Sequence, residues 1–137
     1  MYLALQGNIG LGKAIEYFTS YQYPVSLPLN DTQKYDLIVD IEGSLKRISV
    51  KTSRSKSGYG TYSVQLRNCG GSSGKSKVRP FDNKSCDFIF VLTGEDKTYL
   101  IPTEIIEATN SISVGKKYSE YEVRPKKFST FAAELED

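Results

Sequence analysis

The sequence predicts an α+β fold in which a mixed β-sheet is flanked by helices in a three-layer, α/β-type arrangement. The chain has 137 residues, which is enough for one domain with a buried core. Its composition, with 39% hydrophobic and 25% charged residues, is ordinary for a globular protein. One early segment has helical periodicity, and later segments have the short apolar or alternating pattern of strands. The order α-β-β-β-β-loop-β-β-α predicts a single domain over residues 1–137.

The first helix is predicted over residues 9–22, where apolar side chains recur at helical spacing. Asn8 is its predicted N-cap, because an Asn side chain can accept a hydrogen bond from the first helical turn. The segment 24–28 begins and ends with proline, which predicts a short edge strand, since proline cannot donate to a strand partner.

The next two strands are predicted to form a hairpin over 35–41 and 45–52, joined across Glu42-Gly43-Ser44. The remaining strands are predicted at 61–66, 87–92 and 98–102. The strongly apolar run 87–92 is expected at the centre of the sheet, where both faces are covered. A short helix is expected to begin at Pro102.

Two segments are left without a firm assignment. Residues 68–77 are rich in Gly and Ser, which is typical of a flexible loop. Residues 111–137 mix polar and aromatic positions, which leaves a strand, a helix or an arm for assembly with a partner all open.

Several kinds of chemistry are excluded by composition. The chain has no His, which removes Ser-His-Asp and Cys-His catalysis, and two Cys cannot supply four zinc ligands. Cys69 and Cys86 are therefore expected as reduced thiols, with Cys86 in the core. No apolar run approaches the ~18 residues of a membrane span and the N-terminus lacks a basic leader, so we expect a cytoplasmic protein without a membrane partner.

Positive charge is concentrated in residues 43–80. This segment contains no acidic residue but nine of the 18 basic residues, namely Lys46, Arg47, Lys51, Arg54, Lys56, Arg67, Lys75, Lys77 and Arg79. A net charge of only +2 with one strongly basic segment is typical of a protein that binds a polyanion through one face. The alternative is a solvated loop with a chance run of cations.

The predicted hairpin places three chemically useful side chains at one end. Alternation along a strand puts Ser49 and Lys51 on the same face, while Val50 turns into the core with its carbonyl free to face outward. Asp36 opens the neighbouring strand and can approach them through antiparallel pairing. A carboxylate, another oxygen ligand, a carbonyl and a Lys are sufficient for Mg²⁺-assisted phosphodiester hydrolysis.

Each of these residues also has a structural interpretation. Asp36 can cap a turn, Ser49 can be a solvent-facing hydroxyl, and Lys51 can protect a strand edge from aggregation. Only their combination points to a nuclease site.

The order of a helix, a Tyr-Asp that opens a hairpin, and a following Val-Lys-Thr resembles the PD-(D/E)xK nuclease superfamily. The likeness spans most of residues 8–105 and is carried by PVSLPLNDTQKYDLIVD, ISVKTS and YLIP. Within the superfamily, the spacing is similar to that of small homing endonucleases encoded by cyanobacterial group I introns. The resemblance implies a restriction-endonuclease-like core and Mg²⁺ or Mn²⁺ as cofactor.

The resemblance also implies roles for individual residues. Asp36 takes the place of the metal-binding Asp, Ser49 the (D/E) position and Lys51 the Lys of the motif. The position of the family's helix Glu falls on Leu11, and Glu16 is the one acid of the predicted helix. Leu11 and Ser49 depart from the family pattern, which leaves open whether this chain cleaves.

The segment after the hairpin is predicted to hold a DNA duplex. Arg and Gln side chains read base edges in the major groove, and a two-stranded ribbon fits that groove. The candidate DNA contacts on this loop and strand are Arg54, Lys56, Tyr62, Ser63, Gln65 and Arg67. Lys75, Lys77 and Arg79 lie in or beside a Gly/Ser stretch and are predicted to contact phosphates.

The function expected from the sequence is therefore a sequence-specific, metal-dependent endonuclease of homing type that cuts double-stranded DNA. Cutting both strands takes two active sites, so a homodimer is the minimum, and the resemblance implies a tetramer. Two alternatives remain on the same fold, a DNA-binding module without catalysis and a nuclease that resolves DNA junctions.

Overall fold

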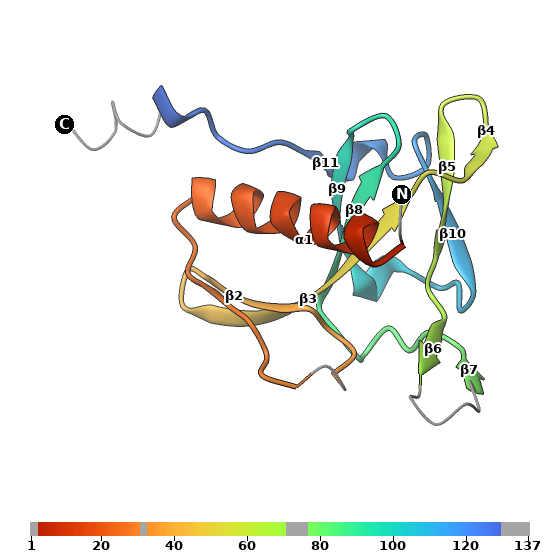
Figure 1. Ribbon diagram of the computed structural model, residues 1–137, viewed down its shortest axis with the longest axis horizontal. Helices are drawn as coiled ribbons and strands as arrows, with labels where there is room; N and C mark the ends of the chain where they lie inside the picture. The colour runs from red at the N-terminus through yellow and green to blue at the C-terminus, as the bar shows by residue number, and fades with distance from the viewer. Residues whose placement is uncertain (1–2, 31–32, 71–76, 130–137) are drawn as a thin grey trace.

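The computed structural model describes residues 3–30, 33–70 and 77–129. Its centre is a six-stranded mixed sheet in the order β1, β2, β3, β8, β9, β11, in which β3 and β8 are parallel and all other neighbours antiparallel (Figure 1). The strands are β1 (Val25–Ser26), β2 (Leu37–Ile41), β3 (Ser44–Ser53), β8 (Phe88–Thr93), β9 (Thr98–Pro102) and β11 (Glu122–Val123).

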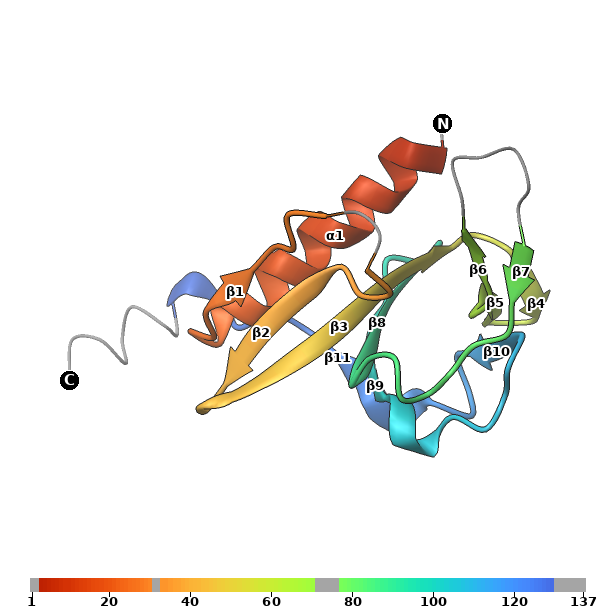
Figure 2. The ribbon, with the colours of Figure 1, turned by 90° about the horizontal axis from the view of Figure 1, so that it is seen from below.

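One face of this sheet is covered by the helix α1 (Leu3–Ser20), and the other by a small antiparallel sheet (Figure 2). The small sheet has the order β10 (Ser111–Val114), β5 (Thr61–Gln65), β4 (Lys56–Gly58). A separate hairpin pairs β6 (Asn68–Gly70) with β7 (Lys77–Arg79). Single 3₁₀ turns lie at Thr103–Ile105 (η1) and Ser119–Tyr121 (η2).

Apolar residues form a core on each face of β8, because its side chains alternate between the two layers. Phe90 packs with Phe18 and Ala14 of α1, whereas Ile89 and Val91 pack toward the small sheet. The α+β class, the mixed sheet and the central place of residues 87–92 are confirmed. The second covering layer is a sheet, where a helix was expected.

The helix begins earlier than predicted. It starts at Leu3, so Asn8 lies inside it and is not its N-cap. Residues 3–6 are Leu, Ala, Leu and Gln, all favourable in helices, and they extend α1 past the two glycines that obscured its start. The helix ends where Gln22 adopts a φ of 64° and the Tyr23 N–H donates to the Phe18 carbonyl at 3.1 Å.

The β2–β3 hairpin agrees closely with the prediction. Glu42 and Gly43 form a two-residue turn with φ values of 53° and 90°, as a type I′ turn requires. The Asp40 carboxylate stabilises this turn by accepting the Gly43 N–H at 2.8 Å. The turn therefore fixes the pairing of the two strands that carry the candidate site.

Other assignments need refinement. The prolines do bound an edge strand, β1, and Pro102 is followed by a 3₁₀ turn in place of an α-helix. Strands β4, β6 and β7 lie in segments interpreted from their composition as loops. The undecided segment 111–137 forms β10, η2 and β11 up to residue 123, and residues 130–137 lie outside the described part.

Cys86 is a free, buried thiol, as expected. None of the helices described is long and apolar enough to cross a membrane.

Candidate active site

The carboxylate of Asp36 is fixed at the point where β2 begins. The Asp36 N–H donates to the Ile48 carbonyl at 2.8 Å, which ties the residue before β2 to β3. The Asp36 Oδ2 atom then accepts the N–H of Val50 at 2.7 Å. The predicted approach of Asp36 to the end of the hairpin is therefore present.

Strand alternation determines which side chains lie near this carboxylate. Leu37 pairs with Ile48, and both are buried in the core beneath α1. Ser49 and Lys51 therefore lie on the face turned away from α1, about 6.6 Å apart along the strand. Asp36 lies just before β2, and its carboxylate contacts the backbone of Val50, the residue between Ser49 and Lys51.

Val50 contributes its backbone to this cluster. Its side chain packs with the core beneath α1, and its N–H points toward Asp36. The N–H and C=O of one residue in a strand point to the same side, so the Val50 carbonyl also points past the beginning of β2. This carbonyl and the Asp36 carboxylate are two oxygen donors at the same sheet edge.

The three side chains differ in exposure. Asp36 is exposed and Lys51 half-buried, whereas Ser49 is only 5% exposed. Burial raises the pKa of the Cys86 thiol, and a hydrogen bond with Ser85 and the positive charges of Arg47 and Lys51 partly oppose this rise. Asp36 and Lys51 are not among the ion pairs of the described residues, so both charges remain available to a ligand.

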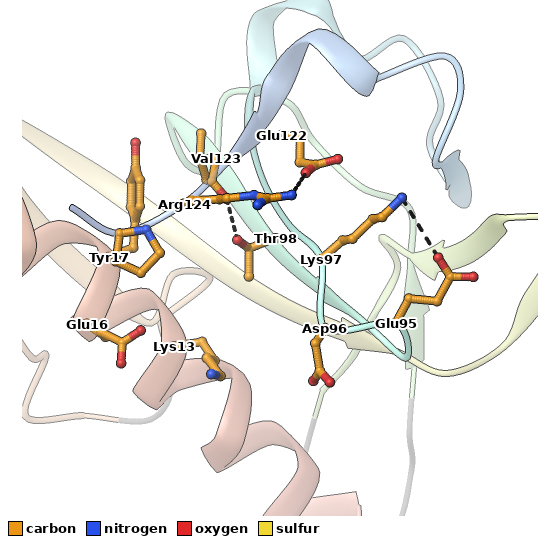
Figure 3. A pocket seen from close by; sticks show the side chains of 11 residues that line it. Lys13, Glu16, Tyr17, Glu95, Asp96, Lys97, Thr98, Glu122, Val123 and Arg124 are labelled. Atoms are coloured by element: carbon orange, nitrogen blue, oxygen red, sulfur yellow. Dashed lines mark hydrogen bonds and ion pairs between the residues drawn. The ribbon is translucent and has the colours of Figure 1, made fainter. Parts of the chain in front are cut away.

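The helix position expected for a Glu does not supply a donor. Leu11 is partly buried against the core beneath α1. Glu16 lies elsewhere, in a cavity of about 500 Å³ between α1, the β8–β9 turn and β11 (Figure 3). Glu16 therefore does not replace the missing helix carboxylate.

A groove runs beside the cluster and is named here the basic groove. It measures about 570 Å³, and its lining contains three cations and no acid among the described residues. It is lined by Gln6, Val50, Lys51, Thr52, Ser53, Arg54, Ser55, Ser63, Gln65 and Arg67. Val50 and Lys51 thus connect the candidate site with a surface suited to a polyanion.

The predicted DNA contacts separate into three groups. Arg54, Ser63, Gln65 and Arg67 lie together on the basic groove. Lys56 and Arg79 are exposed outside its lining; Lys75 lies outside the described residues, as does the side chain of Lys77. Tyr62 is a correction, because its ring is 4% exposed in the core and does not reach the surface.

Gln6 was not predicted from the sequence. It lies on α1, and its side-chain amide donates to the Thr52 hydroxyl at 3.3 Å. Gln6 and Thr52 both line the basic groove, together with Ser63 and Gln65 of β5. It therefore brings the helix to the edge of the candidate site with a neutral polar group. The only available signal was its place in the helix, and the predicted helix began three residues too late to include it.

The donors fit a hydrated hard cation and do not form a closed metal cage. Mg²⁺ commonly keeps several waters and binds one or two carboxylates together with substrate phosphates. Asp36 and the Val50 carbonyl meet that minimum, since both point to the same edge. The described residues contain no cluster of three or more His, Cys, Asp or Glu that could hold a metal by themselves.

Comparison with known proteins agrees with this geometry. The family model described as PD-(D/E)XK endonuclease matches residues 2–133. Among solved structures, the chain is similar to the bacterial homing endonuclease I-Ssp6803I, with a TM-score of 0.72 and 25% identity over 98% of this chain and 93% of that one. A search of curated proteins found no match.

Proposed function

Because the chain belongs to the PD-(D/E)XK endonuclease family, we propose that it is a sequence-specific endonuclease of homing type that cuts double-stranded DNA with a divalent metal. The observation that carries this proposal is the contact of the Asp36 carboxylate with the Val50 N–H, at the edge of a groove whose charged lining residues are all cations. The similarity to a homing endonuclease favours this type over other nucleases.

The roles follow from the chemistry of each group. Asp36 and the Val50 carbonyl would hold Mg²⁺ or Mn²⁺, with Ser49 as a further oxygen within the same cluster. A bound divalent cation would supply charge neutralisation at the phosphate and a more acidic water. Lys51 offsets the negative charge that develops on the phosphate, or orients the attacking water.

The groove holds the substrate in position. Arg54 and Arg67 would bind phosphates, and Gln65, which lines the same groove, would contact base edges. Cleavage of both strands requires two such sites, so we propose at least a homodimer, with a tetramer favoured by the family likeness. We also propose that the protein acts in the cytoplasm, as expected from its sequence.

The function is tested by incubating the protein with a library of long linear duplexes in Mg²⁺, in Mn²⁺ and in EDTA. The proposal predicts cutting at a restricted set of sites in either metal and none in EDTA. If the protein did not bind DNA at low salt, both the endonuclease and any other DNA-binding function would be ruled out. If light scattering showed a monomer both with DNA bound and without it, the proposed homo-oligomer would be wrong.

A DNA-binding protein without catalysis is the second candidate. Leu11 provides no donor and Ser49 is nearly buried, so the site has one carboxylate. This candidate predicts sequence-specific binding with no cutting in either metal.

Restoration separates the two functions. If the chain binds but does not cut, Leu11→Glu combined with Ser49→Gln should produce metal-dependent cutting when missing donors are the sole defect. The same double variant with Asp36→Asn is the matched control and should remain inactive. A folded double variant without cutting would favour the binding protein.

A further inference from the structure

We propose that strand β10 reads DNA sequence together with β5, through the hydroxyl groups of Ser111 and Ser113. The inference rests on the proposed DNA-binding function and extends it to a strand that is distant in sequence from the basic segment. Neither the sequence pattern nor the family comparison points to these two serines.

The pairing of the strands places the serines beside the predicted base contacts. Ser111 is opposite Gln65, and Ser113 is opposite Ser63. Residues directly opposite in an antiparallel pair have side chains on the same face. The two serines therefore continue the face that lines the basic groove.

The exposure of β10 supports this orientation. Ser111 and Ser113 are exposed, whereas Ile112 and Val114 are buried in the core. The polar face of β5 and β10 includes Ser63, Gln65, Ser111 and Ser113, and Arg67 follows two residues after the end of β5. Polar side chains in a double row are unnecessary for packing this sheet, because its other face supplies the apolar contacts.

The polar face is held in a defined shape. The Ser113 and Ser57 hydroxyls lie 2.7 Å apart, and Ser57 donates to the Thr61 hydroxyl at 3.1 Å. The Ser53 hydroxyl donates to the Ser63 carbonyl, and the Ser63 N–H donates to the Ser55 carbonyl at 2.8 Å. These bonds attach the small sheet to the end of β3, two residues beyond Lys51.

The surroundings of β10 also suit a duplex. Lys116 and Lys117 are exposed just after the strand and line a cavity together with Ser111 and Ser113. These cations can contact phosphates of a duplex that lies along β10. Glu107 lies in the same cavity, and a carboxylate there can accept a hydrogen bond from the amino group of cytosine.

The dimensions of a β-ribbon match the spacing of base pairs. Alternate residues on a strand are about 6.6 Å apart, close to two base-pair steps of about 3.4 Å. Ser111 and Ser113 should therefore read positions two base pairs apart, adjacent to those read by Gln65 and Ser63. The Ser111 hydroxyl can both donate to and accept from base edges in the major groove, whereas Ser113 donates to Ser57 and offers its oxygen as an acceptor.

The test is selection of bound duplexes from a randomised library in EDTA, where cutting cannot distort the result. The proteins are the full chain, the double variant Ser111→Ala with Ser113→Ala, and Gln65→Ala. Ser44→Ala is the control, because Ser44 is an exposed serine at the other end of β3. Circular dichroism checks that each variant is folded.

The expected result is loss of base preference in the double variant at positions next to those lost in Gln65→Ala. Affinity for the selected site should fall about three- to tenfold for each hydroxyl that contacts a base, with affinity for random DNA unchanged. The control should select the same sequence as the unsubstituted chain.

Different failures have different meanings. An unsubstituted chain that binds no DNA, or binds without preference, overturns the proposed function and this inference together. A double variant that selects the unchanged sequence overturns only the role of β10. An equal loss of affinity on every sequence also overturns it, because the serines would then contact the backbone.

Discussion

Asp36 accepts a backbone N–H through one oxygen and leaves its charge exposed, an arrangement that fixes a carboxylate without neutralising it. If the chain cuts DNA, Asp36→Asn should lower the single-turnover cutting rate on the order of 10²–10³-fold, as when a group that stabilises the transition state is lost. DNA affinity in EDTA should remain, because the Asn oxygen still accepts from Val50.

A second carboxylate on the same strand is the control for that substitution. Asp40 accepts the Gly43 N–H at 2.8 Å at the opposite end of β2. Asp40→Asn should leave cutting intact, and equal losses in both variants would mean that Asp36 has only a structural role.

At the residue scale, the sequence predicted correctly those side-chain positions that depend on the alternation of residues along one hairpin. Ser49 and Lys51 share a face because of the period of two, and one short turn brings Asp36 to the backbone of Val50 between them. Tyr62 was misassigned although alternation separates it from Ser63, and the structure shows its ring in the core. Gln6 was missed because its partner Thr52 is 46 residues away.

Helix α1 approaches β3 closely at a single glycine. A Cβ atom at Gly10 would lie 2.3 Å from Thr52 Cγ2, whereas one at Gly12 would meet nothing within 4 Å. Rotation of Thr52 would relieve the clash, but its branched side chain is stiff and its hydroxyl accepts from Gln6.

We therefore expect opposite results from two alanine substitutions in this helix. Gly10→Ala should destabilise the protein by about 1–3 kcal/mol through overpacking. Gly12→Ala should stabilise it by about 0.5–1 kcal/mol, because alanine favours the helix and nothing obstructs it. Urea unfolding measures both, and equal stabilisation would show that α1 does not approach β3 closely.

Asp87 links the beginnings of the parallel strands β3 and β8 through hydrogen bonds with Arg47. Its Oδ2 atom accepts the Arg47 N–H at 2.8 Å and the Arg47 Nε–H at 3.3 Å. Burial acts to raise the pKa of Asp87, but these hydrogen bonds and the Arg47 charge outweigh it and hold that pKa below its ordinary value.

This lowered pKa gives a prediction for acid unfolding. A carboxyl with a lowered pKa in the folded state stabilises the protein above its unfolded-state pKa and loses this effect as pH falls through the folded-state pKa. Asp87→Asn should therefore lower stability most near neutral pH, and the difference from the unsubstituted protein should shrink below about pH 4. A difference that is constant in urea titrations from pH 7 to pH 3 would contradict this role.

At the element scale, strand pairing beyond the hairpin was not predictable from local pattern. Strand β10 pairs with β5 across more than forty residues, and β4, β6 and β7 are only three residues long. Such strands form because neighbouring strands supply partners, and their own composition indicates loops. The two strands of the site could therefore be predicted from the sequence, whereas much of the surface beside the site could not.

At the scale of the whole molecule, two charged regions differ in their balance of positive and negative charge. The basic groove lies at one end of α1, and the cavity of Figure 3 contains the pairs Lys97–Glu95 at 3.9 Å and Arg124–Glu122 at 3.4 Å. Burial raises the pKa of Tyr17 in that cavity to about 12, so its hydroxyl stays protonated. A polyanion should therefore bind at the groove and not at the cavity.

This difference predicts which side-chain cations displace condensed counterions from the DNA when it binds. The logarithm of the affinity should fall linearly with the logarithm of the salt concentration, with a slope of about −0.9 for each phosphate contacted in duplex DNA. Arg54→Ala and Arg67→Ala should each make that slope shallower by about 0.9, because both side chains line the groove. Lys97→Ala removes one positive charge from the cavity of Figure 3, where Lys97 is paired with Glu95, and should leave the slope unchanged. Fluorescence anisotropy from 50 to 300 mM salt, a range of about sixfold, measures the slope for all three variants. If Lys97→Ala changed the slope as much as the arginine variants, the duplex would have to contact the opposite end of the helix, and the basic groove would lose its assignment.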